Sequence, residues 1–121
     1  TANERAALIG TERGLAFLLG QQELTTRDYG FRSGRTETDP NRSGVATPYA
    51  HEMGCFVDTS GRSNYWLSTV NGSYIGSMRY NGSIGNANVY RDNIGIRVAV
   101  WVDLYALTLH SGEGTLSNPY R

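Results

Sequence analysis

The residues best suited to binding chemistry gather in one stretch of the chain, residues 64–93. In this stretch 18 of the 30 residues are Asn, Tyr, Ser or Gly. Tyrosine offers a large, rigid contact area at low entropic cost, and Asn, Ser and Gly offer adaptable hydrogen bonds, as in antibody combining sites. The composition therefore indicates a binding surface. Hairpins alone would also explain it, because Asn, Ser and Gly are turn residues and Tyr favours strands.

Two kinds of side chain in this stretch would contact a ligand. Aromatic rings would stack on it, and amide or charged groups would hydrogen-bond to it, a combination that suits a glycan or a protein loop. We expect the stacking residues to be Tyr65, Tyr74, Tyr80 and Tyr90. We expect the polar contacts to come from Asn71, Asn81, Asn86, Asn88, Arg91 and Asp92.

Catalytic and metal-binding motifs are not recognisable in the sequence. It contains no nucleophile elbow, no glycine-rich phosphate loop and no paired-histidine metal motif. His51 and His110 have no partner at metal-ligand spacing, and the single Cys55 excludes an internal disulfide. We therefore predict no catalytic residue, no metal and no cofactor. The alternative, an enzyme with an unrecognised site, would show a deep pocket holding carboxylates or His51.

Length and charge limit the remaining classes. A chain of 121 residues is long enough for one domain with one core. Its 11 basic residues are all arginine and are balanced by 11 acidic residues, so attraction to nucleic acid or anionic membrane is not expected. No apolar run approaches the roughly 20 residues of a membrane span. The absence of a signal peptide and of an initiating Met at Thr1 predicts a processed or excised piece.

The first half of the chain predicts short elements. Residues 3–9 favour a helical turn, and the apolar run at 15–19 favours a buried strand followed by a helix. Residues 32–44 lack hydrophobic periodicity, which predicts a mobile surface connection, with a ligand lid as the alternative. Residues 47–54 predict a complete short helix, since Thr47 suits the N-cap, Pro48 the first helical position and Gly54 the end.

The second half predicts an antiparallel meander over residues 65–102. Asn71-Gly72 and Asn81-Gly82 are strong hairpin signals, because both residues of such a turn must accept positive φ. The apolar alternation slips between Ile84 and Val89, which indicates a bulge. In the last strand one face is expected to be core: Ile94, Ile96, Val98, Val100 and Val102. The other face would carry Gly95, Arg97, Ala99, Trp101 and Asp103.

The order of several segments resembles a known family. "AFLLGQQEL", "TPYAHEMG", "YWL", the Gly/Asn/Tyr-rich stretch and "GIRVAVWVDL" are similar to the second half of a bacterial domain of unknown function that ends in "WLRSPG" and "GVRPALWL" blocks. That family resembles C-type-lectin-like folds, as do formylglycine-generating enzymes and the variable proteins of diversity-generating retroelements. The similarity covers residues 15–104.

The resemblance implies an α+β, C-type-lectin-like domain over residues 1–104, with short helices around a small twisted antiparallel sheet and long loops, followed by a tail at 105–121. It implies a secreted or cell-surface bacterial protein, or a phage particle. The family's first half is shortened or missing ahead of Thr1, so either the chain is a compact variant or another segment or an oligomer completes the sheet.

Particular residues carry the likeness and its departures. "WLRSPG" is here "WLSTVNG", and "RPALW" is "RVAVW". The resemblance implies structural roles for Trp66, Arg97 and Trp101, with the arginine paired to a carboxylate or to backbone carbonyls and Trp101 packed nearby. Formylglycine chemistry would need cysteines late in the domain, and animal-lectin calcium sites need motifs that this chain lacks. Neither activity is expected.

Three functions follow as hypotheses. The first is a non-enzymatic module that binds a glycan or protein ligand through residues 64–93. The second is a display protein diversified by a retroelement, and the third is an assembly domain of a phage particle or surface layer.

Overall fold

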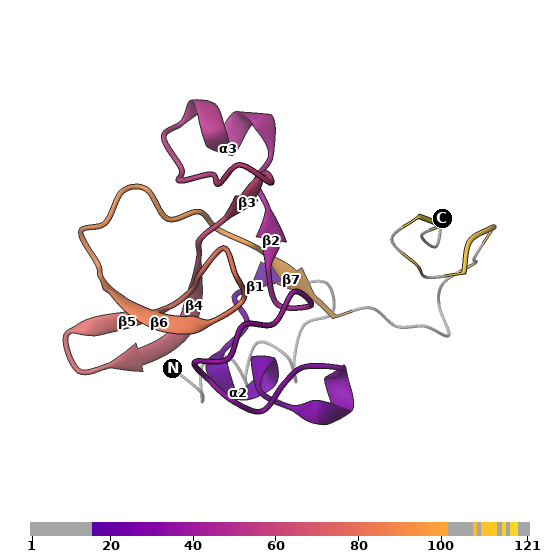
Figure 1. Cartoon of the computed structure of the whole chain (residues 1–121), viewed down its shortest axis with the longest axis horizontal. Coiled ribbons are helices and arrows are strands. Elements are labelled where there is room, and N and C mark those ends of the chain that lie inside the picture. Colours follow the sequence, from indigo (N-terminus) through magenta and orange to yellow (C-terminus); the bar gives the residue numbers. More distant parts are fainter. Residues whose placement is uncertain (1–15, 102–107, 109, 114, 116, 119–121) are drawn as a thin grey trace.

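The computed structural model describes residues 16–101, 108, 110–113, 115, 117 and 118. In this part of the chain a few short helices accompany small antiparallel sheets, so the coarse α+β expectation is confirmed (Figure 1). The helix expected at residues 3–9, and Val102 and Asp103 of the last strand, lie outside the described residues.

The largest sheet has the strand order β4-β5-β6, formed by β4 (Tyr65–Asn71), β5 (Tyr74–Met78) and β6 (Ile84–Asn88). Both pairings are antiparallel, so the meander is confirmed as far as β6. The core lies on this sheet, where α2 (Gln21–Leu24) supplies one buried leucine. Its buried members are Leu24, Tyr65, Leu67, Met78 and Ile84, with Leu19 and Phe31 packed against them.

The two hairpin turns differ from the expected geometry. Asn71 pairs with Tyr74, so the first loop is Gly72-Ser73, and only its glycine has positive φ, at 59°. In the second, the Gly82 N–H donates to the Arg79 carbonyl at 2.8 Å, and Gly82 takes φ 81°. No described residue other than glycine has positive φ. The asparagines therefore precede the left-handed positions, and the expected pairs of positive-φ residues are wrong.

The bulge also lies elsewhere. β5 and β6 pair without a slip from Tyr74↔Asn88 to Met78↔Ile84, whereas the β4–β5 register shifts between Trp66 and Val70. At this shift the Ser68 N–H donates to the Leu19 carbonyl at 3.0 Å. The irregular part of β4 thus binds the segment that leads into α2.

The expected last strand of the meander is not part of this sheet. After β6 the chain makes a wide excursion (Figure 1). Gly95 then forms one isolated parallel bridge with Tyr65, and β7 (Ala99–Val100) pairs with β1 (Ala16–Phe17). Ile96, Val98 and Val100 are 70%, 57% and 53% exposed. The predicted core face is therefore wrong, because no layer of the described structure covers it. β1 is a strand as expected, but its Ala16 is exposed rather than buried.

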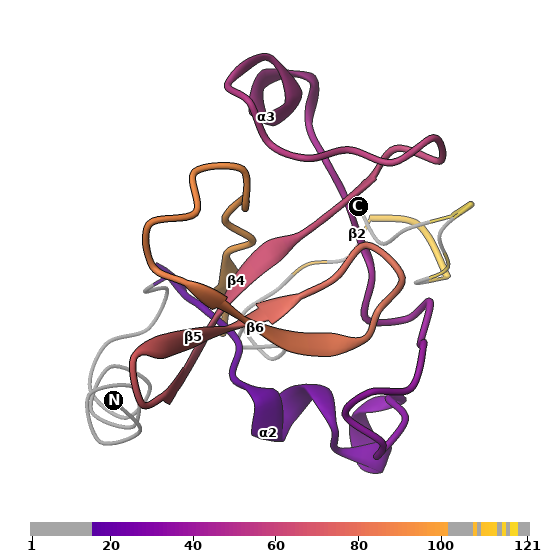
Figure 2. The ribbon, with the colours of Figure 1, turned by 60° about the vertical axis from the view of Figure 1, so that its left-hand side comes forward.

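Two peripheral elements lie at opposite ends of the sheet, α2 at one and α3 (Pro48–Glu52) at the other (Figures 1 and 2). α3 confirms its sequence prediction, since the Thr47 hydroxyl accepts a hydrogen bond from Ala50 N at 3.1 Å and Pro48 is the first helical residue. β2 (Gly44–Val45) and β3 (Arg62–Ser63) form a two-stranded ladder at the base of α3. The turn η1 (Arg27–Tyr29) follows α2.

The connection predicted at residues 32–44 is irregular and mostly exposed, as expected, but two buried charged side chains anchor residues 31–43 to the body of the protein. Arg42 is fully buried, and its Nε lies 3.5 Å from a carboxylate oxygen of the buried Asp39. Its terminal nitrogens donate to four backbone carbonyls, those of Leu24, Arg32, Gly34 and Glu37, at 3.3, 3.4, 3.0 and 2.8 Å. One arginine thus binds three carbonyl groups of this irregular segment and one of α2, which anchors the segment without a helix or strand.

This segment is also tied to the hairpin. The Asp39 N–H donates to the Asn81 carbonyl at 3.2 Å, and Ile84 N donates to the Arg35 carbonyl at 2.8 Å. Gly82 packs so closely on Asp39 that an added Cβ would overlap the Asp39 carbonyl. Only glycine fits there, both for space and for its positive φ.

Candidate ligand-binding groove

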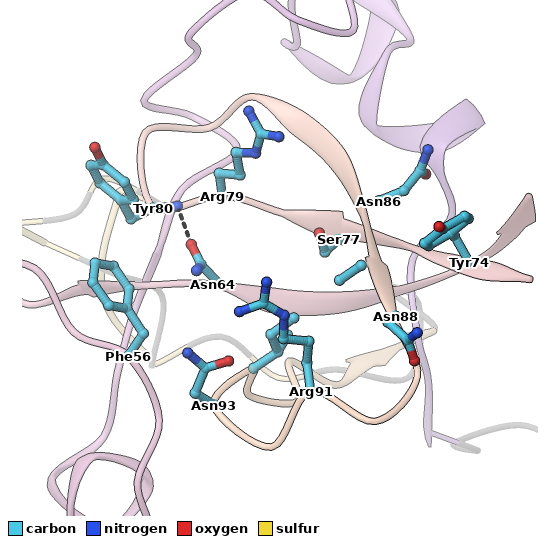
Figure 3. Close-up of a pocket in the computed structure, with 12 residues that line it drawn as sticks. Phe56, Asn64, Tyr74, Ser77, Arg79, Tyr80, Asn86, Asn88, Arg91 and Asn93 are labelled. Atoms are coloured by element: carbon cyan, nitrogen blue, oxygen red, sulfur yellow. Dashed lines mark hydrogen bonds between the residues drawn. The ribbon is translucent and has the colours of Figure 1, made fainter.

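A groove of about 420 Å³ runs between the meander and the segment that follows β6 (Figure 3). It combines aromatic, amide and arginine side chains, the types that orient a polar ligand in a concave site. Its lining residues are Phe56, Asn64, Tyr74, Ser77, Arg79, Tyr80, Asn86, Ala87, Asn88, Arg91, Asn93 and Ile94.

Aromatic rings stand at both ends of the groove. Phe56 and Tyr80 lie at one end with ring centroids 5.6 Å apart and planes tilted by 54°, while Tyr74 lies at the other (Figure 3). Phe56 reaches the groove from beyond α3, and its N–H donates to the Asn93 carbonyl at 2.9 Å. Tyr74 and Tyr80 are 53% and 40% exposed, so both rings can contact a ligand.

Asn64 fixes one wall of the groove. Its side-chain oxygen accepts a hydrogen bond from Tyr80 N at 2.8 Å, which holds the turn after β5 (Figure 3). Its backbone carbonyl accepts from Gly95 N at 2.9 Å, which holds the segment after β6. One residue therefore joins the two chain segments that face each other across the groove.

A second polar cluster centres on Asn86 in β6. Its side-chain oxygen accepts from Asn71 Nδ2 at 2.8 Å and from an Arg35 terminal nitrogen at 3.0 Å. The cluster connects β4, β6 and the segment of residues 31–43. Asn71 thus supports a lining residue without lining the groove itself.

Half of the predicted ligand-binding residues line the groove. These residues are Tyr74, Tyr80, Asn86, Asn88 and Arg91. Outside the lining lie the exposed Asn71, Tyr90 and Asp92, and the half-buried Asn81. The side-chain oxygen of Asn81 accepts from both N and Oγ of Ser83, so this residue serves its turn.

Tyr65 requires a correction, because it is a core residue. Its ring is 5% exposed and its hydroxyl donates to the Arg42 carbonyl, so it is not available for stacking on a ligand. Burial raises the pKa of this phenol above its usual range, and the nearby Arg97 opposes that shift.

The sequence prediction missed five polar or aromatic lining residues. Four of them, Asn64, Ser77, Arg79 and Asn93, belong to the Asn/Tyr-rich stretch, and composition alone does not distinguish them from their neighbours. The fifth, Phe56, lies before that stretch and is brought in by its long-range hydrogen bond to Asn93. No local pattern marks that pairing.

The three residues given structural roles lie outside the groove. Arg97 donates to the Ser43 carbonyl at 3.1 Å, and its guanidinium carbon lies 5.4 Å from the centre of the Tyr65 ring, within cation–π range. Trp101 stacks on Phe17 at 6.3 Å, which joins β7 to β1. Trp66 is half-buried in β4, and its N–H donates to the Gly95 carbonyl.

A larger hollow of about 610 Å³ lies beside Arg97, between β2, α3 and residues 95–98. Its only aromatic lining residue is Tyr65, which is buried. Asn64 borders this hollow too, and Arg62 and Arg97 add guanidinium groups, but among the described lining residues it has one amide and no accessible aromatic ring.

Two absences concern the part of the chain that the structure describes. It contains no group of three or more His, Cys, Asp or Glu side chains placed to hold a metal ion. None of its helices is both long and apolar enough to cross a membrane.

No protein-family model matches the chain, no curated protein matches it in sequence, and no solved structure matches its fold.

Proposed function

We propose that this chain is a non-enzymatic binding module that holds a glycan in the groove between β5, β6 and residues 89–94. The observation that carries the proposal is the placement of accessible tyrosine rings at both ends of a groove lined with amides (Figure 3). Aromatic rings pack on the apolar faces of sugars, and amides hydrogen-bond to hydroxyl groups. A C-type-lectin-like architecture and a secreted, cell-surface or phage location are part of the same proposal.

The arrangement of the lining side chains favours a glycan over a protein loop. Flat protein interfaces of standard size bury about 800 Å² on each partner around an apolar centre. Here the aromatic rings are separated by the amides of Asn64, Asn86 and Asn88. Such spacing suits alternating stacking and hydrogen bonding along a short oligosaccharide.

The test is a glycan array probed with the wild-type chain, with Tyr74→Ala/Tyr80→Ala and with Tyr90→Ala. Tyr90 is 89% exposed and lies outside the groove, so it is a matched control. We expect the double variant to lose about tenfold or more in affinity and the control to bind as the wild type does. Circular dichroism checks that all three are folded. Absence of any glycan ligand, or equal loss in the control, would contradict the proposal.

One observation favours a second candidate, an assembly domain. Four exposed apolar residues lie close together in the chain near β7: Ile96, Val98, Val100 and Trp101. Contiguous exposed apolar surface marks interaction sites. If assembly is the function, light scattering will show oligomers that grow with protein concentration, and Val98→Ser will reduce them. A monomer at all concentrations would rule this candidate out.

A further inference from the structure

We propose that the ligand of the groove is an acidic glycan, whose carboxylate or sulfate groups are bound by Arg79 and Arg91; this inference rests on the binding function proposed above. The first reason is the local charge. Among the described residues its lining contains two arginines and no Asp or Glu, although the whole chain carries equal numbers of acidic and basic residues. The hollow beside Arg97 has the same pattern in Arg62 and Arg97, but there Arg97 already donates to the Ser43 carbonyl.

The second reason is that both guanidinium groups are unpaired. No hydrogen bond or ion pair links the side chain of Arg79 or Arg91 to any residue that the structure describes. Arg42 binds four carbonyls, Arg35 binds Asn86 and Arg97 binds Ser43, whereas the exposed side chain of Arg32, outside the groove, also has no partner among the described residues. The groove thus presents free donors in the fork geometry that matches carboxylate and sulfate oxygens.

The third reason is the state of the amides. The side-chain oxygens of Asn64, Asn86 and Asn88 already accept hydrogen bonds, from Tyr80 N, from Asn71 and Arg35, and from Tyr90 N. Within the described chain their NH₂ groups donate to no partner. An asparagine oxygen has two lone pairs, so Asn86, which accepts two hydrogen bonds, offers only donors, whereas Asn64 and Asn88 each keep one acceptor site beside two donors. Amides and arginines together make the groove rich in donors, which selects a ligand rich in acceptors.

The fourth reason is that the two arginines stand on ordered turns. Arg79 begins the turn closed by the Gly82 N–H, and its side chain lies against Gly85, where an added Cβ would come within 2.9 Å of Nε. The Arg91 N–H donates to the Asn88 carbonyl at 3.0 Å. Their backbone positions are therefore fixed before a ligand binds, which reduces the entropic cost of binding.

A nucleic acid would also offer acidic groups and stacking surfaces, but the charge pattern favours a glycan. Affinity for nucleic acid comes from neutralising several successive phosphates along a basic track. The groove has two cationic residues, and the chain has no net positive charge. Isolated acidic groups on a sugar chain fit two arginines better.

The test uses paired acidic and neutral oligosaccharides of the same backbone, such as galacturonic acid with galactose oligomers, sialylated with asialo glycans and sulfated with unsulfated glycans. A single-stranded oligonucleotide is the further probe. We expect at least one acidic oligosaccharide to bind tenfold or more tightly than its neutral partner. We expect this binding to weaken as the salt concentration rises. The carboxylate and sulfate pairs identify which acidic group is preferred.

Two variants separate this inference from the proposed function. Arg79→Gln/Arg91→Gln should lose at least tenfold in affinity for the acidic probe and little for the neutral one, whereas Arg32→Gln, exposed and outside the groove, should change neither. Arg91→Lys should keep part of the affinity. Neutral probes that bind equally well, an unaffected double variant, or tighter binding of the oligonucleotide would overturn the acidic ligand. If Tyr74→Ala/Tyr80→Ala still weakened neutral glycans, the binding function itself would stand; absence of glycan binding altogether would overturn both.

Discussion

Residues 31–43 and residues 94–101 reverse the usual relation between polarity and burial. The first segment is polar and irregular, yet it buries Asp39 and Arg42. The second is mostly apolar, yet it exposes Ile96, Val98 and Trp101. Burial in this protein follows the satisfaction of backbone groups and the availability of a covering layer, not side-chain polarity alone.

The physical difference lies in what each segment meets. Arg42 binds four carbonyls and lies beside the Asp39 carboxylate, so its charge is largely compensated and its burial is tolerated, although its buried Nε makes no hydrogen bond. Among the described residues, residues 99 and 100 pair with β1 in a two-residue ladder, and Ile96 and Val98 border the open hollow beside Arg97. A pair of two-residue strands has no second layer to cover one face.

The largest expected effect follows from removing the buried arginine. Arg42→Ala leaves the Asp39 carboxylate unpaired and four carbonyls without donors, which should lower the free energy of unfolding by about 3–5 kcal/mol. Urea denaturation followed by circular dichroism measures it. Arg32→Ala removes an exposed arginine of the same segment and should change stability by no more than about 0.5 kcal/mol. Equal effects in the two variants would show that residues 31–43 do not depend on the buried charge.

A smaller effect is expected at Tyr65, where the core meets residues 31–43. Its hydroxyl donates to the Arg42 carbonyl, so Tyr65→Phe should cost about 0.5–1.5 kcal/mol at neutral pH.

The same residue also makes stability depend on pH. Burial raises its pKa, so the unfolded chain ionises first, and stability present below the ordinary tyrosine pKa of about 10 is lost as pH rises through the folded-state pKa. Urea denaturation at pH 7 and above pH 10 should show a smaller alkaline loss for Tyr65→Phe than for wild type. An identical alkaline loss would mean that another group is responsible.

The smallest effect is expected in the exposed apolar segment. Ile96→Ser and Val98→Ser should each change the free energy of unfolding by no more than about 0.5 kcal/mol, because both side chains are already largely in water. Leu67→Ala in the core is the reference and should cost about 2–5 kcal/mol. If Ile96→Ser or Val98→Ser lowered the free energy of unfolding as much as Leu67→Ala does, the segment would be covered in solution.

Much of the local structure was predictable from the sequence. α3 follows from Thr47 and Pro48, and the two hairpins from the positions of Gly72 and Gly82, because caps and left-handed turns depend on residue types a few positions apart. Five of the twelve lining residues were also predicted, since Tyr74, Tyr80, Asn86, Asn88 and Arg91 belong to one compositionally distinct stretch.

Only the tertiary structure decided which of these residues work together. In the tertiary structure Tyr65 lies in the core and the bulge lies in β4. Phe56 and Arg79 line the groove, and Arg42 binds four backbone carbonyls. Each of these outcomes depends on hydrogen bonds or packing between residues far apart in the chain, such as Phe56 with Asn93 and Tyr65 with Arg42. Local composition determined the turns and caps because their energies are local, whereas burial and the donor-rich character of the groove depend on which distant groups become neighbours.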